Sequence, residues 1–318
     1  MSQNPAIPVV RELLAALHPH ELAVAVHTWT AWPLRCPPAG ELPVMHLQEA
    51  LDAGFVEIGE LKSPRVPHVQ VQHQGEEPVL FPAGALLEGG AQTRIIATPT
   101  LVMPHTTASI DVRCVESGRW DTHRRDTFHT LRSAPVGFST SKLRRDASSR
   151  MATRGRAADQ SETWDDVEAF LTTRDTQTIT RSLTHGLDAE TVRIDRRRRS
   201  QSPAERTRTQ QTLAGAGGLA VQREAGRWHS LEVYGTQRLA HHGTRLAAEA
   251  LELEAGAPLE ARAQARPDLR FEDLASAEWS ARDAGEATLV DFRTPGGTCG
   301  TALVYRQAVL QLSVTWAA

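Results

Sequence analysis

One short segment, residues 78–120, carries side chains that can hold a phosphorylated ligand. Two of its expected strands have polar or aromatic residues close to their ends: Gln92, Arg94, Glu116, Arg119 and Trp120. The guanidinium groups of Arg94 and Arg119 can bind a phosphate or a carboxylate through two hydrogen bonds. Gln92 would add a further hydrogen bond, and Trp120 would offer a surface for stacking. These five residues are our candidate ligand-binding set.

Glu116 is the one candidate for a catalytic group in this set, and it has two interpretations. Alternating residue types over 107–116 predict a strand that points Ile110, Val112 and Cys114 into the core. If the strand continues, Glu116 also points inward, where an unpaired charge costs several kcal/mol. It then needs an arginine partner. The pair either fixes the strand ends or forms part of a ligand site in which Glu116 accepts from a ribose hydroxyl.

The elements around this segment indicate an α+β protein. We expect a β-rich N-terminal half, an antiparallel sandwich or barrel-like structure, followed by a smaller α+β half. The expected parts are an N-terminal helix in residues 1–20, the β-rich half in 21–120, a basic connecting region in 121–212 with a helix at 162–172, and the α+β half in 213–318. Residues 21–318 together are expected to form one unit.

Two stretches of the connecting region have weak patterns. The apolar pattern fades over residues 117–160, which predicts a long, partly irregular connection. Residues 188–213 predict a charged helix or a flexible segment that is broken at Pro203. The C-terminal part is clearer, with a hairpin at 219–234, a helix at 237–253 and three strands from 286 to 316.

The segment 78–120 resembles the signature region of the ARPP domain family. The chain has PVLFPAGALLEGGAQTR and IDVRCVESGRW, where the family pattern has PVLLLEGEELVGAKQNR and PVSCVEQGRW. Weaker similarity in HLQEALDAGFVEIGE and QSETWDDVEAFL extends the resemblance over nearly all of the chain beyond residue 20. The family is named for its association with ADP-ribosylglycohydrolases and rhodanese-phosphatase proteins, which makes such proteins possible partners.

The resemblance implies binding or processing of an ADP-ribose-, NAD-related or nucleotide-like ligand. Gln92, Arg94, Glu116, Arg119 and Trp120 match the family pattern. Ala91 and Thr93 stand where the pattern has Lys and Asn, so we expect binding without catalysis if those two residues carry the family's chemistry. The alternative is a non-catalytic scaffold or interaction protein whose signature residues form a structural ion-pair network. No motif assigns a reaction or a cofactor.

Composition excludes several other classes. No apolar run approaches the roughly 20 residues of a membrane-spanning helix, and the N-terminus lacks the features of a signal peptide, so we expect a cytoplasmic protein. The cysteines Cys36, Cys114 and Cys299 have no metal-binding spacing, and we predict no metal site. Cys114 is expected to be a buried, inert thiol.

The middle of the chain is basic, although the formal net charge of the whole chain is −3. Residues 113–212 contain 20 Arg and Lys against 14 Asp and Glu. The run Arg196–Arg199 could contact RNA phosphates, but a solvated charged segment is the favoured interpretation. Nucleic-acid binding is therefore not expected.

Overall fold

A large antiparallel sheet dominates the computed structural model, which describes residues 4–36, 42–61, 67–118, 127–153, 160–176, 179–224 and 226–317. Its strands are β1 (His18–Pro19), β2 (Leu22–Val26), β3 (Trp29–Arg35), β13 (Gly218–Arg223), β14 (Arg227–Tyr234), β15 (Glu260–Ala263), β16 (Glu278–Ala284), β17 (Ala287–Arg293), β18 (Cys299–Tyr305) and β19 (Ala308–Thr315). The order is β15-β2-β3-β13-β14-β19-β18-β17-β16, with β1 paired to β3. N-terminal and C-terminal strands therefore share one sheet.

A closed barrel forms the second part of the fold. Its strands are β5 (Val56–Gly59), β6 (His68–His73), β8 (Ala85–Gly89), β9 (Arg94–Ile96), β11 (Thr107–Cys114) and β12 (Thr127–Ser133). They close in the order β11-β6-β5-β12-β8-β9. A small sheet of β10 (Thr100–Val102), β7 (Val79–Phe81) and β4 (Met45–His46) lies beside it. Alternate residues such as Val69, Val71, Ile110 and Val112 fill the barrel interior.

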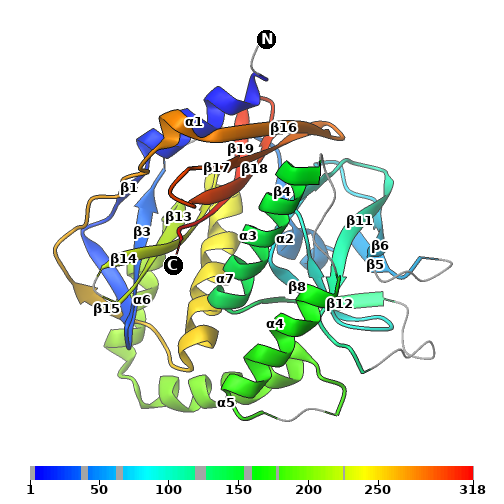
Figure 1. The fold of residues 1–318 in the computed structure, drawn as a ribbon. Coiled ribbons are helices and arrows are strands. Elements are labelled where there is room, and N and C mark those ends of the chain that lie inside the picture. The colour runs from blue at the N-terminus through cyan, green and yellow to red at the C-terminus, as the bar shows by residue number, and fades with distance from the viewer. Residues whose placement is uncertain are drawn as a thin grey trace.

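Two long helices lie between the sheet and the barrel (Figure 1). They are α3 (Val136–Thr153) and α7 (Gln237–Ala255). Thr236 caps the start of α7 by accepting from the Leu239 backbone N at 3.2 Å, and Gly256 ends it in the left-handed conformation with φ +63°. The buried face of α7 packs Leu251 against strand residues such as Leu219 and Val221. The opposite face of the sheet is covered by α1 (Ala6–Ala16).

The remaining helices surround this centre. They are α2 (Leu47–Asp52), α4 (Gln160–Thr173), α5 (Leu183–Ser200) and α6 (Pro203–Leu213), with a 3-10 turn at Leu274–Ser276. Ser202 and Glu205 form a reciprocal capping box at the start of α6, where Pro203 is the first helical residue. No residue of α6 is buried. This helix therefore contacts its neighbours, β15 and β2, only through exposed or partly exposed residues.

The expected α+β class and the barrel-like N-terminal half are confirmed. The prediction of an irregular connection over residues 117–160 was wrong, because the structure has β12 and α3 there. The apolar pattern of α3 is weak since its buried face carries Lys142, Asp146 and Arg150, which are paired with other charged groups. The predicted break at Pro203 is confirmed, with helices on both sides of it.

Candidate functional site

The structure brings three of the predicted site residues together in the interior. Gln92 lies in the turn before β9, Arg94 begins β9, and Glu116 follows β11. Their exposed fractions are 4, 0 and 1%. Arg94 Nη1 donates to Gln92 Oε1 at 2.8 Å, and Gln92 Nε2 donates to the Glu116 backbone O at 3.0 Å. The three residues form one connected network at the strand ends.

Two further groups extend this network. The Glu116 carboxylate accepts from the backbone N and the hydroxyl of Thr93, both at 3.3 Å. Arg94 Nη2 lies 3.5 Å from Glu60 Oε1, which also accepts from the Ala91 backbone N at 3.0 Å. Ala91 and Thr93, where the family pattern has Lys and Asn, are themselves buried. In the described part of the chain, the network connects β9 and β11 to Glu60, which follows β5.

Cys114 was predicted to point into the core from β11. It is 0% exposed, which confirms this prediction. Its Sγ donates to the Glu116 backbone O at 2.9 Å. Burial raises the pKa of the Cys114 thiol, opposed by the hydrogen bond with the Glu116 backbone and by the charge of Arg94. Arg113, on the other face of the same strand, is also buried, and its Nη1 donates to the Val112 backbone O at 3.2 Å.

Arg119 and Trp120 lie outside the described residues. The backbone just before them is held by the N-terminal end of α5. The Gly118 N donates to the Thr180 O at 2.8 Å, and the Leu183 N donates to the Val115 O at 3.0 Å. A contact between a ligand and these signature residues stays a prediction.

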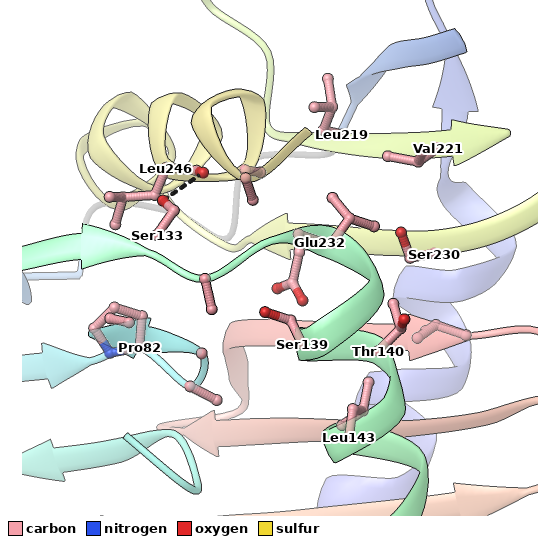
Figure 2. Close-up of a pocket in the computed structure, with 18 of the residues that line it drawn as sticks. Pro82, Ser133, Ser139, Thr140, Leu143, Leu219, Val221, Ser230, Glu232 and Leu246 are labelled. Atoms are coloured by element: carbon pink, nitrogen blue, oxygen red, sulfur yellow. Dashed lines mark hydrogen bonds between the residues drawn. The ribbon is translucent and has the colours of Figure 1, made fainter. Parts of the chain in front are cut away.

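A cavity that the sequence did not indicate lies between the large sheet, α3, α7 and the β7–β8 turn. Its volume is about 70 Å³ and its lining is mostly apolar. Glu232 on β14 points into it towards Ser139 of α3 (Figure 2). Glu232 Oε2 accepts from Ser313 Oγ at 2.8 Å and from Gln311 Nε2 at 3.2 Å. Gln311 Oε1 in turn accepts from the Ala83 backbone N at 3.0 Å, so it joins the β7–β8 turn to the sheet.

The electrostatics of this cavity favour a protonated carboxyl group. Burial raises the pKa of Glu232 to about 7, although the hydrogen bonds from Ser313 and Gln311 lower it. Burial also raises the pKa of Tyr234, and the negative charge of Glu232 adds to this effect. A carboxyl group that titrates near neutral pH beside a cavity is a recurring property of acid–base and binding sites.

The sequence contained part of this signal. In β14 the residues Ser230, Glu232 and Tyr234 alternate with Leu231 and Val233, so the acidic residue lies on the face away from the apolar pair. Such a face is exposed in a sheet that is covered on one side. The structure shows that α3 and α7 cover the face that carries Glu232, which the sequence pattern alone does not indicate.

A second and larger hollow lies between α5, α6 and α7, with a volume of about 710 Å³. Each helix contributes one stripe of residues at helical spacing. The stripe on α6 is Arg206, Thr209, Gln210 and Leu213; the stripe on α7 includes His241, Arg245, Glu249 and Glu252. We call this hollow the α5–α6–α7 groove. Its size is typical of small-molecule and cofactor sites.

The described residues contain no group of three or more His, Cys, Asp or Glu side chains that could hold a metal ion. Among the helices of the described ranges, none is long and apolar enough to cross a membrane. The two neighbouring histidines His241 and His242 have ring planes at 88° to each other. This geometry directs their nitrogens in different directions.

The fold and its buried signature network agree with the comparison with protein families. The chain belongs to the ARPP-1 family, described as the ARG and Rhodanese-Phosphatase-superfamily-associated Protein domain, which matches residues 22–315. No curated protein matches the chain. No solved structure matches it either.

Proposed function

We propose that this protein binds an ADP-ribose-, NAD-related or nucleotide-like ligand in the α5–α6–α7 groove. The observation that carries this proposal is the groove itself, about 710 Å³ in volume. Residues of α5, α6 and α7 line it, and α6 buries none of its residues. A hollow of this volume is large enough to hold a nucleotide.

Arginines on two walls of the groove supply groups for a phosphate. Arg245 on α7 is exposed, and it has no hydrogen-bond or ion-pair partner among the described residues. Arg206 on α6 uses Nη1 for the backbone oxygens of Arg198 and Gln201, at 3.3 and 3.2 Å. Its other guanidinium nitrogens stay available. Two guanidinium groups on facing helices match a diphosphate better than a single one does.

The remaining lining fits the sugar and base of a nucleotide. Glu249 accepts one backbone hydrogen bond, from Ser133, and is the acceptor proposed for ribose hydroxyls, since Glu252 already accepts from both Arg198, at 2.6 Å, and the Leu259 backbone N, at 3.0 Å. Burial raises the pKa of Glu249, while Arg132 opposes this effect. Ile194, Leu213 and Leu253 offer apolar surface for a base. The lining supports binding and contains no assembled nucleophile and base.

The family description supports the choice of ligand class. It associates the domain with the ARG and rhodanese-phosphatase superfamilies. Proteins of these classes, ADP-ribosylglycohydrolases among them, are the partners that we propose, because a shared ligand would connect them. This support comes from association and does not identify a reaction.

The second candidate is a structural role for the signature residues, and their burial favours it. Gln92, Arg94 and Glu116 bind one another and neighbouring backbone groups, with at most 4% of each residue exposed. Such residues cannot touch a ligand unless the strand ends move apart. Ligand binding by Gln92, Arg94, Glu116, Arg119 and Trp120 therefore stays a separate proposal that the same experiment can test.

Calorimetric titration of the full chain with ADP-ribose, NAD and ADP tests these alternatives. We expect Arg245→Ala to weaken binding about 10- to 100-fold, as the loss of a charge-assisted hydrogen bond predicts. Arg199→Ala, which removes an exposed arginine outside the groove on α5, is the matched control and should bind normally.

Three results would contradict the groove as the site. The first is that none of the three ligands binds. The second is that Arg245→Ala and Arg199→Ala lose affinity equally. The third is that Arg245→Ala binds normally. Loss of binding in a folded Arg94→Ala protein, with Arg245→Ala normal, would instead place the ligand at the signature residues. Circular dichroism of each variant establishes that it is folded.

A further inference from the structure

The cavity beside Glu232 has one negatively charged group and no positive one among its described lining residues. Glu232 and Tyr234 are the titratable side chains of this lining; the elements packed around them contribute apolar, serine and threonine side chains from α3, α7, β13, β19 and the β7–β8 turn. Glu232 Oε2 is engaged by Ser313 and Gln311. Glu232 Oε1 accepts no hydrogen bond from any described residue, so it is free to meet a ligand.

Two hydroxyl groups of the cavity lining donate their hydrogens to backbone oxygens, and the hydroxyls of Ser139 and Ser230 complete the polar part of the lining. Ser133 Oγ donates its hydrogen to the Leu246 backbone O at 2.6 Å (Figure 2). Thr140 Oγ1 donates to the Gly137 backbone O at 3.1 Å. Each hydroxyl has one hydrogen, so these two oxygens can act towards a ligand only as acceptors. Together with Glu232 Oε1 they make an acceptor-rich environment that lacks donors with a positive charge.

The remaining walls are apolar and set the size of the occupant. Leu143, Leu219 and Val221 are among the side chains that line the space. The cavity volume is about 70 Å³, whereas a cavity of roughly 10–15 Å³ on this measure already admits one water molecule. The space therefore suits a small molecule rather than a nucleotide. A ligand that suits it has a compact cationic donor group and a short hydrocarbon tail.

We propose that this cavity is a binding site for a small primary ammonium cation, a short alkylamine in its protonated form. The ammonium group donates to Glu232 Oε1 and to the acceptor oxygens of Ser133 or Thr140. The one- to three-carbon tail packs on the leucine and valine walls. An ammonium has three donors and no acceptor, which complements this lining. Pairing also compensates the buried carboxylate, whose charge is otherwise costly in this environment.

Binding of the cation is linked to a proton. Only the ionised carboxylate pairs with an ammonium, so the protonated carboxyl group must first release its proton. The pKa of Glu232 lies near 7 in the unliganded protein because of its burial. The apparent affinity should therefore rise about tenfold per pH unit below 7 and level off above it. A neutral occupant of the same size would show no such dependence.

Titration calorimetry with methylammonium, ethylammonium and propylammonium chloride tests the site at pH 5.5 and pH 8 and at constant ionic strength. We expect saturable binding at pH 8 that weakens at least tenfold at pH 5.5. Near pH 6.5, the heat should depend on the ionisation enthalpy of the buffer, because a proton is released. Methanol and ethanol, as neutral analogues, should not bind measurably at the same concentrations.

Two variants locate the site. Glu232→Gln keeps the shape of the side chain, and we expect it to lose at least tenfold in affinity and all dependence on buffer and pH. Ala250→Leu fills the cavity from α7 and retains the carboxyl group, and it should abolish binding as well. The cavity shares Leu246 with the α5–α6–α7 groove, but neither substituted residue lines the groove. Nucleotide binding can therefore be measured separately in the same variants.

Several outcomes would overturn the proposal. They are the absence of alkylammonium binding at pH 8, equal binding of the alcohols, tighter binding of K⁺ or Na⁺ than of the amines, and unchanged affinity in a folded Glu232→Gln protein. Binding that persists unchanged in a folded Ala250→Leu protein would place the amine elsewhere on the molecule.

Discussion

The Glu116 carboxylate accepts two hydrogen bonds from Thr93, one from its backbone N and one from its hydroxyl, each at 3.3 Å. Both residues are buried and come from different segments of the family signature. The pair joins the end of β11 to the beginning of β9, two strands that are neighbours in the barrel. Thr93 thus connects two parts of the signature network through its hydrogen bonds to Glu116.

Glu116→Ala should destabilise the protein by about 2–4 kcal/mol, since it leaves the buried donors of Thr93 without this acceptor. Urea denaturation at pH 7, followed by circular dichroism, measures the change. Glu57→Ala, at an exposed position on β5, is the control and should stay within about 0.5 kcal/mol of the wild type. Similar losses in both variants would contradict a structural role for Glu116.

A second buried pair fixes α3 to the large sheet. Arg150 donates from Nη2 to Asp291 Oδ1 at 2.7 Å and from Nε to Asp291 Oδ2 at 3.0 Å. Asp291→Ala should cost about 3–5 kcal/mol, because it leaves a buried guanidinium without its carboxylate.

Glu260→Ala is the matched control for this pair. It breaks the ion pair with Arg262, in which both side chains are half exposed and lie 3.3 Å apart. The expected loss is below about 1 kcal/mol. The midpoints and slopes of denaturant unfolding give the loss in free energy of unfolding for each variant. Equal midpoints would show that the interior pair adds nothing beyond an exposed one.

The titration of Glu232 should contribute to the pH dependence of the free energy of unfolding. Its folded-state pKa of about 7 lies above the usual carboxyl value of 4.5. The folded state therefore binds the proton more tightly than the unfolded state. The resulting stabilisation is complete below pH 4.5 and is lost as the pH rises to about 7, by roughly 3 kcal/mol at most.

Glu232→Gln removes this dependence. The free energy of unfolding of the variant, relative to the wild type, should increase between pH 5 and pH 8 by up to that amount. Denaturant titrations at four pH values measure the difference, in which all other titrating groups cancel. Parallel curves for the two proteins would show that Glu232 titrates normally.

Much of the fold followed from local patterns, and the exceptions have a physical cause. The barrel strand β11 and the helix α7 were predicted because their apolar residues alternate or recur at helical spacing, whereas β12 lies in the stretch that was expected to be irregular. The helix α3 was missed because its buried face is charged: Lys142 pairs with Asp146 within the same helix, and Arg150 pairs with a group that the fold brings to it. Asp291, which pairs with Arg150, lies 141 positions further along the chain.

The two cavities could not be predicted for a related reason. A cavity depends on which elements face one another, and Glu232 differs from a solvated strand residue only once α3 and α7 cover it. The α5–α6–α7 groove depends on a helix that packs loosely. The signature residues were recognised as a group, but their burial depends on Thr93, Glu60 and the start of α5, which meet only in the folded chain.

The cysteines should react slowly with thiol reagents in the native protein. Burial raises the pKa of Cys36 to about 12 and that of Cys299 to about 11, and it raises the pKa of Cys114 as well. Few thiolates are then present at pH 8. Titration with a chromogenic disulfide should give three thiols in denaturant and a small fraction of one within minutes in buffer. Fast native reaction of Cys114 would show that the signature strand opens.

The loose packing of α6 predicts that its cap controls local rather than global stability. Ser202→Ala removes the acceptor for the Glu205 backbone N, now at 3.2 Å, and should destabilise the helix by about 1 kcal/mol. Since no α6 residue is buried, amide exchange should accelerate about fivefold within residues 203–213 while the thermal midpoint of the whole protein stays nearly constant. Ser200→Ala, outside the capping box, is the control. If Ser202→Ala instead lowers the midpoint of the whole protein by several degrees, α6 folds as part of the core. The α5–α6–α7 groove would then be a rigid feature of the structure.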